Sequence, residues 1–279
     1  MTTTHQPPSG SDLAPTPAPG LRPVLLLAAV ALPAGWVLLS LALALELPLE
    51  PFVLLTTYGA MVVPVLLLTA RESGRAGRSR LLRNAVRGPR PWWWWLVAAL
   101  AIPALTWAPA YGLGRTEPLT GELVSGVAIS FVTGLLLVNL AEEMVWMGFV
   151  QTRVMTRWGL VGGSLAAAGL FAGIHLPLAL AGASSLSQVL TGVAGLFGAS
   201  VVLRLVFGAV RVFSGPGLAS IALMHATYNA TGQLLQPGSD LLRLAAVVVL
   251  AAVLVPAAVL RSRSSRTVPR QHVDPEEQA

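Results

Sequence analysis

Eight stretches of about 20 apolar residues dominate this chain and decide its fold class. They cover residues 24–45, 51–70, 93–112, 124–152, 160–181, 186–208, 215–233 and 241–260. A helix needs about 20 consecutive apolar residues to cross a bilayer. Charged residues make up only 11% of the chain, whereas soluble domains carry about 25%. The sequence therefore predicts an all-α, polytopic membrane protein with about eight transmembrane helices.

The distribution of arginine predicts how these helices are oriented. All 18 basic residues are Arg, and most of them lie in residues 71–90 and 261–270. Basic loops stay on the cytoplasmic side of a membrane. Eight crossings with both termini in the cytoplasm place both Arg clusters inside and the loop with Glu46 and Glu50 outside. Basic residues beside a membrane helix also attract anionic lipid, so we expect lipid at the Arg-rich loops and no nucleic acid as a partner.

The composition divides the chain into five parts. Residues 1–21 are rich in Pro, Thr and Ser and lack the basic start of a signal peptide, which predicts a disordered tail. Residues 22–122 hold three transmembrane helices and a basic cytoplasmic loop at 71–91. Residues 123–233 hold helices four to seven and form the candidate catalytic core. Residues 234–262 form the last transmembrane helix, and 263–279 are expected to be a disordered tail.

The absence of cysteine excludes a thiol nucleophile and Cys-ligated metals. The use of Arg alone, with abundant Ala, Leu, Gly and Pro, is typical of a GC-rich bacterial genome. We therefore expect a multi-pass protein of a bacterial plasma membrane. The sequence does not indicate an oligomeric state.

Seven strongly polar residues lie in the interior of the apolar stretches, away from their ends. They are Asn139, Glu142, Glu143, His175, Arg204, His225 and Asn229. A charged side chain at the centre of a bilayer costs about 2.5–3.5 kcal/mol on insertion scales, so such residues are candidates for a functional site. Arg204 is expected to set topology near the inner face. Asn139 could serve either packing or the site.

Helical geometry predicts that several of these side chains meet. If residues 124–152 and 160–181 form an antiparallel hairpin, Glu142 and His175 are equally distant from its turn at Trp158–Gly159. At 1.5 Å per residue, both lie about 20–25 Å from that cytoplasmic turn. His225 and Asn229 share one helix face at a similar depth. Glu143 points about 100° away from Glu142, so the two glutamates can have different roles.

One carboxylate, two imidazoles and a carboxamide at one depth fit hydrolysis without a protein nucleophile. A carboxylate beside a His can hold and deprotonate water, and a second His with an Asn can stabilise an oxyanion. The same Glu142, His175 and His225 could instead bind Zn²⁺. A proton-coupled transporter is a rival function, because Glu and His also relay protons across membranes. Clustering at one depth favours hydrolysis near the cytoplasmic half of the bilayer.

Three short motifs resemble those of the CAAX-protease and bacteriocin-processing (CPBP, or ABI) family of intramembrane proteases. They are "EEMVWMGF", "FAGIH" and "HATYN", which begin at Glu142, Phe171 and His225. The family includes the type II CAAX prenyl endopeptidases. The resemblance covers about residues 121–233 and implies an endopeptidase that acts on a membrane protein or peptide.

By the same resemblance, each polar residue has a role. Glu142 is the general base, His175 helps it to hold the water, and His225 and Asn229 form the oxyanion hole. Phe171 fills the family's aromatic position, and Glu143 is a supporting carboxylate. The resemblance favours a metal-free reaction, with Zn²⁺ as the alternative.

The chain departs from the family at one position. The family carries an Arg five residues after the first Glu, one helical turn from Glu143, where this chain has Met147. Without that Arg, Glu143 is expected to be protonated or to pair with another cation, such as Arg204 or Arg153. A catalytically silent membrane scaffold is therefore a further alternative.

Overall fold

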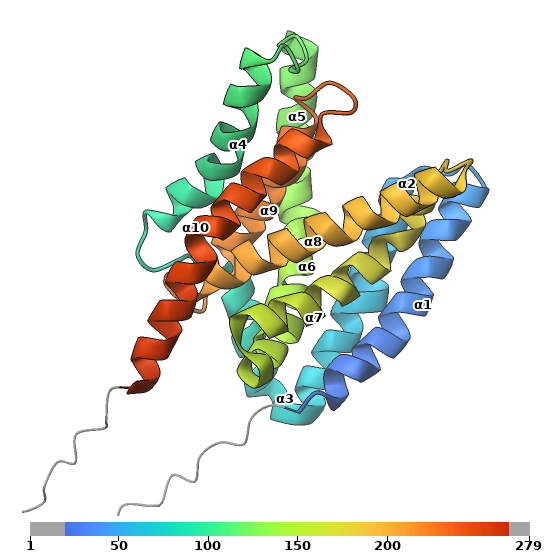
Figure 1. The fold of residues 1–279 in the computed structure, drawn as a ribbon. Helices are drawn as coiled ribbons and strands as arrows, with labels where there is room; N and C mark the ends of the chain where they lie inside the picture. The colour runs from blue at the N-terminus through green and yellow to red at the C-terminus, as the bar shows by residue number, and fades with distance from the viewer. Residues whose placement is uncertain (1–19, 268–279) are drawn as a thin grey trace, which may run out of the picture.

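The computed structural model describes residues 20–267, and all regular secondary structure in this range is helical apart from an isolated β-bridge between Thr116 and Leu235. Figure 1 shows the helices as a bundle whose two halves separate toward one end. The elements are α1 Arg22–Ala44, α2 Leu49–Leu54, η1 Leu55–Val62, α3 Val63–Val86, α4 Trp94–Gly112, α5 Gly121–Thr133, η2 Gly134–Asn139, α6 Leu140–Glu143, η3 Met144–Gln151, α7 Thr152–Leu180, α8 Leu186–Ser214, α9 Ala219–Gly232 and α10 Asp240–Thr267. The η segments are π-helical turns that continue the neighbouring α-helices.

Six helices in the described range are long and apolar enough to cross a membrane by length and composition. They span Arg22–Ala44, Leu49–Val86, Trp94–Gly112, Gly121–Leu180, Leu186–Ser214 and Asp240–Ser264. This confirms an all-α chain with the composition of a multi-pass membrane protein. The stretch Gly121–Leu180 contains two of the eight predicted segments, because the chain reverses within it. Helix α9, which corresponds to the seventh, has 14 residues and is about 21 Å long.

The predicted hairpin is confirmed. Gly159 adopts a left-handed φ of 71°, which glycine tolerates at no steric cost, and breaks α7 there. Residues on the two sides of the break then pair in antiparallel order. The ring of Trp146 meets Phe171 edge-on at 5.7 Å, and Gln151 Nε2 donates to Ser164 Oγ at 2.9 Å.

Close packing at the hairpin turn makes Gly163 a sensitive position. A Cβ at Gly163 would lie 2.5 Å from the backbone N and Cα atoms of Met155, which cannot move aside. Gly163→Ala is therefore expected to destabilise the protein by about 1–3 kcal/mol. The measurement is thermal unfolding in detergent.

Gly169→Ala is the matched control, because a Cβ at Gly169, on the same helix, meets nothing within 4 Å. Alanine forms helix better than glycine by about 1 kcal/mol, so the control should unfold at the same temperature or slightly higher. Equal losses in the two variants would contradict the packing argument.

Two predicted boundaries were wrong. The basic segment 71–91 is not simply a loop, because α3 continues to Val86 after a break at Gly74, where φ is 60°. Gly77, Leu81 and Ala85 recur every four residues and are buried, so this part of α3 has one packed face and an exposed Arg-rich face. At the other end of the chain, α10 extends to Thr267, so residues 263–267 of the predicted tail are helical. Residues 1–19 and 268–279 of the predicted tails lie outside the described residues.

Charge separates the two ends of the bundle. One end, called here the Arg-rich end, carries residues 71–90, the turn around Gly159 and the α8–α9 connection. These segments contact one another, since Arg153 pairs with Glu72 at 2.6 Å and the amide of Arg90 donates to the Ser214 carbonyl oxygen at 2.8 Å. The other end, called here the acidic end, carries the α1–α2, α4–α5, α7–α8 and α9–α10 connections. Its charged residues are Glu46, Glu50, Arg115, Glu117, Glu122, Asp240 and Arg243.

Candidate active site

The paired glutamates lie on a single α-helical turn between two π-helical segments. Helix α6 runs only from Leu140 to Glu143, with η2 before it and η3 after it. A π-helical turn inserts an extra residue into a helix and occurs often at functional sites. Both glutamates are buried here, with exposed fractions of 6% for Glu142 and 0% for Glu143.

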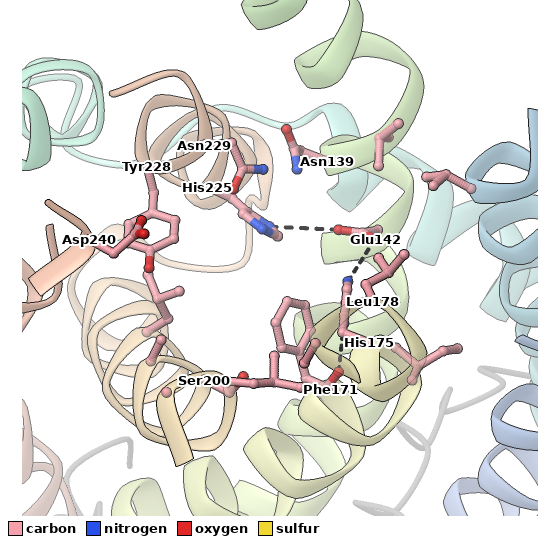
Figure 2. Close-up of a pocket in the computed structure, with 18 of the residues that line it drawn as sticks. Asn139, Glu142, Phe171, His175, Leu178, Ser200, His225, Tyr228, Asn229 and Asp240 are labelled. Atoms are coloured by element: carbon pink, nitrogen blue, oxygen red, sulfur yellow. Dashed lines mark hydrogen bonds and ion pairs between the residues drawn. The ribbon is translucent and has the colours of Figure 1, made fainter. Parts of the chain in front are cut away.

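Glu142 faces a cavity and lies beside His175. The Glu142 Oε1 atom is 3.9 Å from His175 Nε2, and Glu142 Oε2 is 3.9 Å from His225 Nδ1. Figure 2 shows the three side chains on one wall of the hollow. A separation of 3.9 Å is too long for a direct hydrogen bond but leaves room for one water molecule that contacts both groups.

The tautomer of the His175 ring follows from the contact that its Nδ1 atom makes. His175 Nδ1 lies 2.7 Å from the carbonyl oxygen of Phe171, which can only accept a hydrogen bond. Nδ1 therefore carries a proton, and in the neutral ring Nε2 is an acceptor that faces Glu142. The ring of Phe171, 4.5 Å away between centroids, fixes the imidazole from one side.

Glu143 points away from the cavity and forms a buried ion pair. Its two oxygens accept from Arg204, at 2.5 Å from Nη2 and 3.0 Å from Nη1, and both residues are fully buried. The guanidinium also lies over the rings of Phe171 and Phe207. A carboxylate that accepts from both guanidinium nitrogens is ionised, so Arg204 supplies the cation that Met147 cannot.

Glu143 in turn orients His225. The Nδ1 atom of His225 donates to Glu143 Oε1 at 2.9 Å, since an ionised carboxylate only accepts. This contact fixes the ring and leaves Nε2 free. A row of charged and polar contacts therefore runs from the buried core to the cavity wall, from Arg204 through Glu143 to His225.

Asn229 and Asn139 complete the polar wall. Asn229 lies one turn after His225 on α9, is exposed and lines the cavity. Asn139 is 2% exposed and lines the same cavity. Figure 2 shows both carboxamides on the side of the hollow where Glu142 and His225 lie. Asn139, for which the sequence left packing and site lining open, therefore belongs to the site wall.

The cavity has a volume of about 1000 Å³. Pockets for small ligands commonly measure about 300–1,000 Å³, so this one can take a peptide segment. Nine helical elements contribute side chains, from α1 and α2 on one side to α9 and α10 on the other. Apolar residues such as Leu39, Val53 and Leu196 form much of its wall.

The structure corrects the interpretation of Arg204 and adds residues that the sequence did not indicate. Arg204 is not a topological residue near the inner face, because it is the buried partner of Glu143. The alternative partner Arg153 pairs with Glu72 instead.

Tyr228, Asp240 and Arg243 line the outer part of the cavity. Asp240 and Arg243 lie at the start of α10, far in sequence from the three motifs, and no spacing pattern connects them with the site.

Comparison with protein families identifies a related family. Residues 124–231 match the family model described as type II CAAX prenyl endopeptidase Rce1-like. No curated protein matches the chain. The matched region begins in α5, ends in α9 and contains Glu142, Glu143, His175, Arg204, His225 and Asn229.

Proposed function

Because residues 124–231 belong to the Rce1-like family of type II CAAX prenyl endopeptidases, which is a peptidase family, we propose that this protein is an intramembrane endopeptidase. Its substrate is a membrane-associated protein or peptide, and water activated by Glu142 is the nucleophile. The observation that carries the proposal is the 3.9 Å separation of Glu142 Oε1 and His175 Nε2 at the cavity wall.

The first step is the activation of water. A water between Glu142 and His175 donates one hydrogen to the carboxylate and one to Nε2, so its lone pairs face the cavity. When the water oxygen attacks the peptide carbonyl carbon, Glu142 takes the proton. A positioned general base of this kind accelerates reactions by about 10²–10⁴-fold.

The second step needs donors for the oxyanion and a proton for the leaving amine. His225 Nε2 and the Asn229 amide group are placed one helical turn apart on the same cavity wall. His225 already donates from Nδ1 to Glu143, so Nε2 donates only when the ring is an imidazolium, which ionised Glu143 stabilises. As the C–N bond breaks, the proton moves from Glu142 to the nitrogen, which yields a carboxylate and an amine.

The zinc alternative uses Glu142, His175 and His225 as ligands. Within residues 20–267, no three His, Cys, Asp or Glu side chains are arranged so that they could hold a metal ion. The Nδ1 atoms of His175 and His225 contact the Phe171 carbonyl oxygen and Glu143, so only their Nε2 atoms could meet a metal. We propose a reaction without metal, in which the Glu142 carboxylate activates the water.

Metal removal tests this proposal. Treatment of the purified protein with a zinc chelator is expected to leave the cleavage rate unchanged, because water is activated by the carboxylate. Elemental analysis should find zinc well below one ion per chain. Stoichiometric zinc that is lost together with activity in His175→Ala would contradict it.

The cavity also argues against a proton-coupled transporter. A transport path needs polar groups that connect both faces of the membrane. The lining contains no residue between Met144 and Leu170. The layer beneath it is filled by buried Glu143, Trp146, Arg204 and Phe207. A cavity closed on one side fits a hydrolytic site.

The scaffold alternative loses its motivation in the structure. It rested on Met147 in place of the family's Arg, but Arg204 pairs with Glu143 from α8.

We propose in addition that all eight helical segments lie in the plasma membrane of a bacterium, with both termini cytoplasmic. The exposed Arg face of α3 would then contact anionic lipid.

A comparison of membrane peptides tests the proposed function. Membranes from cells that produce the protein are compared by mass spectrometry with membranes that hold equal amounts of the Glu142→Gln variant. We expect truncated membrane proteins or released peptides with shared new termini in the first sample alone. Identical profiles would overturn the proposed activity.

A further inference from the structure

The cavity extends from the candidate active site toward only one end of the bundle. On α8 its lining runs from Leu203, beside the site, back to Thr191 near the start of the helix, a distance of about 18 Å. On α7 it runs from Phe171 to Ala179, next to the end of that helix. On α10 only the first turns line it, from Asp240 to Leu244. The cavity therefore opens at the acidic end.

The opposite direction is closed. The layer between the site and the Arg-rich end contains Gln151, whose amide donates to Ser164 Oγ and to the Arg204 carbonyl oxygen. Gln151, Ser164 and Arg204 are each fully buried. A Cβ at Gly208 in this layer would come within 2.7–2.9 Å of three side chains. The buried side chains of this layer are therefore closely packed.

The charges of the two ends decide which end faces the cytoplasm. The Arg-rich end holds seven Arg between residues 71 and 90, together with Arg153, Arg157 and Arg211, against Glu72 alone. The acidic end holds five carboxylates and two Arg, which are Glu46, Glu50, Glu117, Glu122, Asp240, Arg115 and Arg243. The positive-inside rule places the Arg-rich end in the cytoplasm.

From these observations we infer that the active site receives its substrate from the extracytoplasmic side of the membrane. This inference rests on the proposed function and names the substrate class. The substrate is the extracytoplasmic juxtamembrane segment of an exported or membrane-anchored protein. It differs from the expectation of hydrolysis near the cytoplasmic half, which considered depth along the helices but not the direction in which the cavity opens.

The two walls of the cavity fit such a segment. One wall is apolar and includes Leu39, Val53 and Leu196, which suits the last residues of a membrane anchor. The other wall includes Tyr228 and the Arg243–Asp240 pair, joined at 2.6 Å, at the mouth. These groups can hydrogen-bond the backbone of an extended peptide that leaves the bilayer.

The absence of cysteine allows a direct test. Single cysteines are introduced at Thr191 and Leu241, which are exposed at the mouth, and at Arg78, which is exposed on the Arg-rich face of α3. Intact cells are treated with a membrane-impermeant maleimide. Thr191→Cys and Leu241→Cys should be labelled in intact cells, and Arg78→Cys only after permeabilisation.

A fourth position tests access to the interior of the cavity. Ala199 is half-buried on the cavity wall, between the mouth and the site. Ala199→Cys should react in intact cells with a small impermeant methanethiosulfonate, more slowly than Thr191→Cys. Labelling of Arg78→Cys in intact cells, with the mouth cysteines protected until permeabilisation, would overturn the inference. If Ala199→Cys is protected in intact cells while the cysteines at the mouth react, the inference that the site is accessible from this side is wrong.

The labelling does not depend on catalysis. All variants can be prepared with Glu142→Gln in the same chain, and their reactivity should be unchanged. A protein that labels as expected but produces no new termini would refute the proposed peptidase while leaving the orientation intact. New termini on cytoplasmic segments would instead refute the inferred side of access and leave the proposed peptidase activity intact.

Discussion

Glu142→Gln is expected to lower the rate constant of peptide cleavage by a factor of about 10²–10⁴, the usual contribution of a general base. Glutamine has the same shape as glutamate but cannot take a proton from water. The loss should therefore appear in kcat, with little change in KM. The measurement is cleavage by the purified protein of a substrate identified from the membrane-peptide comparison.

Two controls isolate the chemistry. Glu122→Gln removes a carboxylate at the exposed start of α5, away from the cavity lining, and should keep full activity. The thermal unfolding of Glu142→Gln should match that of the unchanged protein, because Glu142 has no hydrogen-bond partner closer than 3.9 Å among the His side chains. Normal cleavage by Glu142→Gln would refute the proposed mechanism.

Arg204→Leu is expected to destabilise the protein by about 3–5 kcal/mol, because it leaves the Glu143 carboxylate buried without its cation. Glu143 is fully buried, and His225 alone remains to donate to it. The expected result is a large drop in the unfolding temperature in detergent. Arg153→Leu is the matched control, since it breaks the partly exposed pair with Glu72, which should cost about 0–1 kcal/mol.

Two double variants separate charge from packing. Glu143→Gln combined with Arg204→Leu removes both charges and should be more stable than Arg204→Leu alone. Its kcat should nevertheless stay low, because His225 has lost the carboxylate that stabilises its imidazolium. Met147→Arg combined with Arg204→Leu returns a cation one turn from Glu143 and should restore part of the activity. If neither double variant improves on Arg204→Leu, the role assigned to the ion pair is wrong.

Depth along the helices was predictable because it depends only on counting residues. Glu142 and His175 are equally far from Gly159, and a helix rises by a constant distance per residue. The hairpin therefore places them at one level whatever the rest of the bundle does. The different directions of Glu142 and Glu143 follow from the same regularity, and the structure agrees in both respects.

The partner of Glu143 was not predictable in the same way. Arg204 is 61 positions away in sequence, and it meets Glu143 only because α8 packs across the hairpin of η3 and α7. The sequence signal was a single Arg inside an apolar stretch, which fits a topological residue equally well. Only the contact decides between the two interpretations.

The amino-acid sequence by itself determined that this is an all-helical chain with the composition of a multi-pass membrane protein, and which four side chains line one level of it. Apolar length and helical rise are local quantities, so they can be counted along the chain. The tertiary structure decided that Glu143 is held by Arg204 and that the cavity opens at the acidic end. Both depend on how helices distant in sequence pack against one another, and buried contacts between them leave no periodic trace in the sequence.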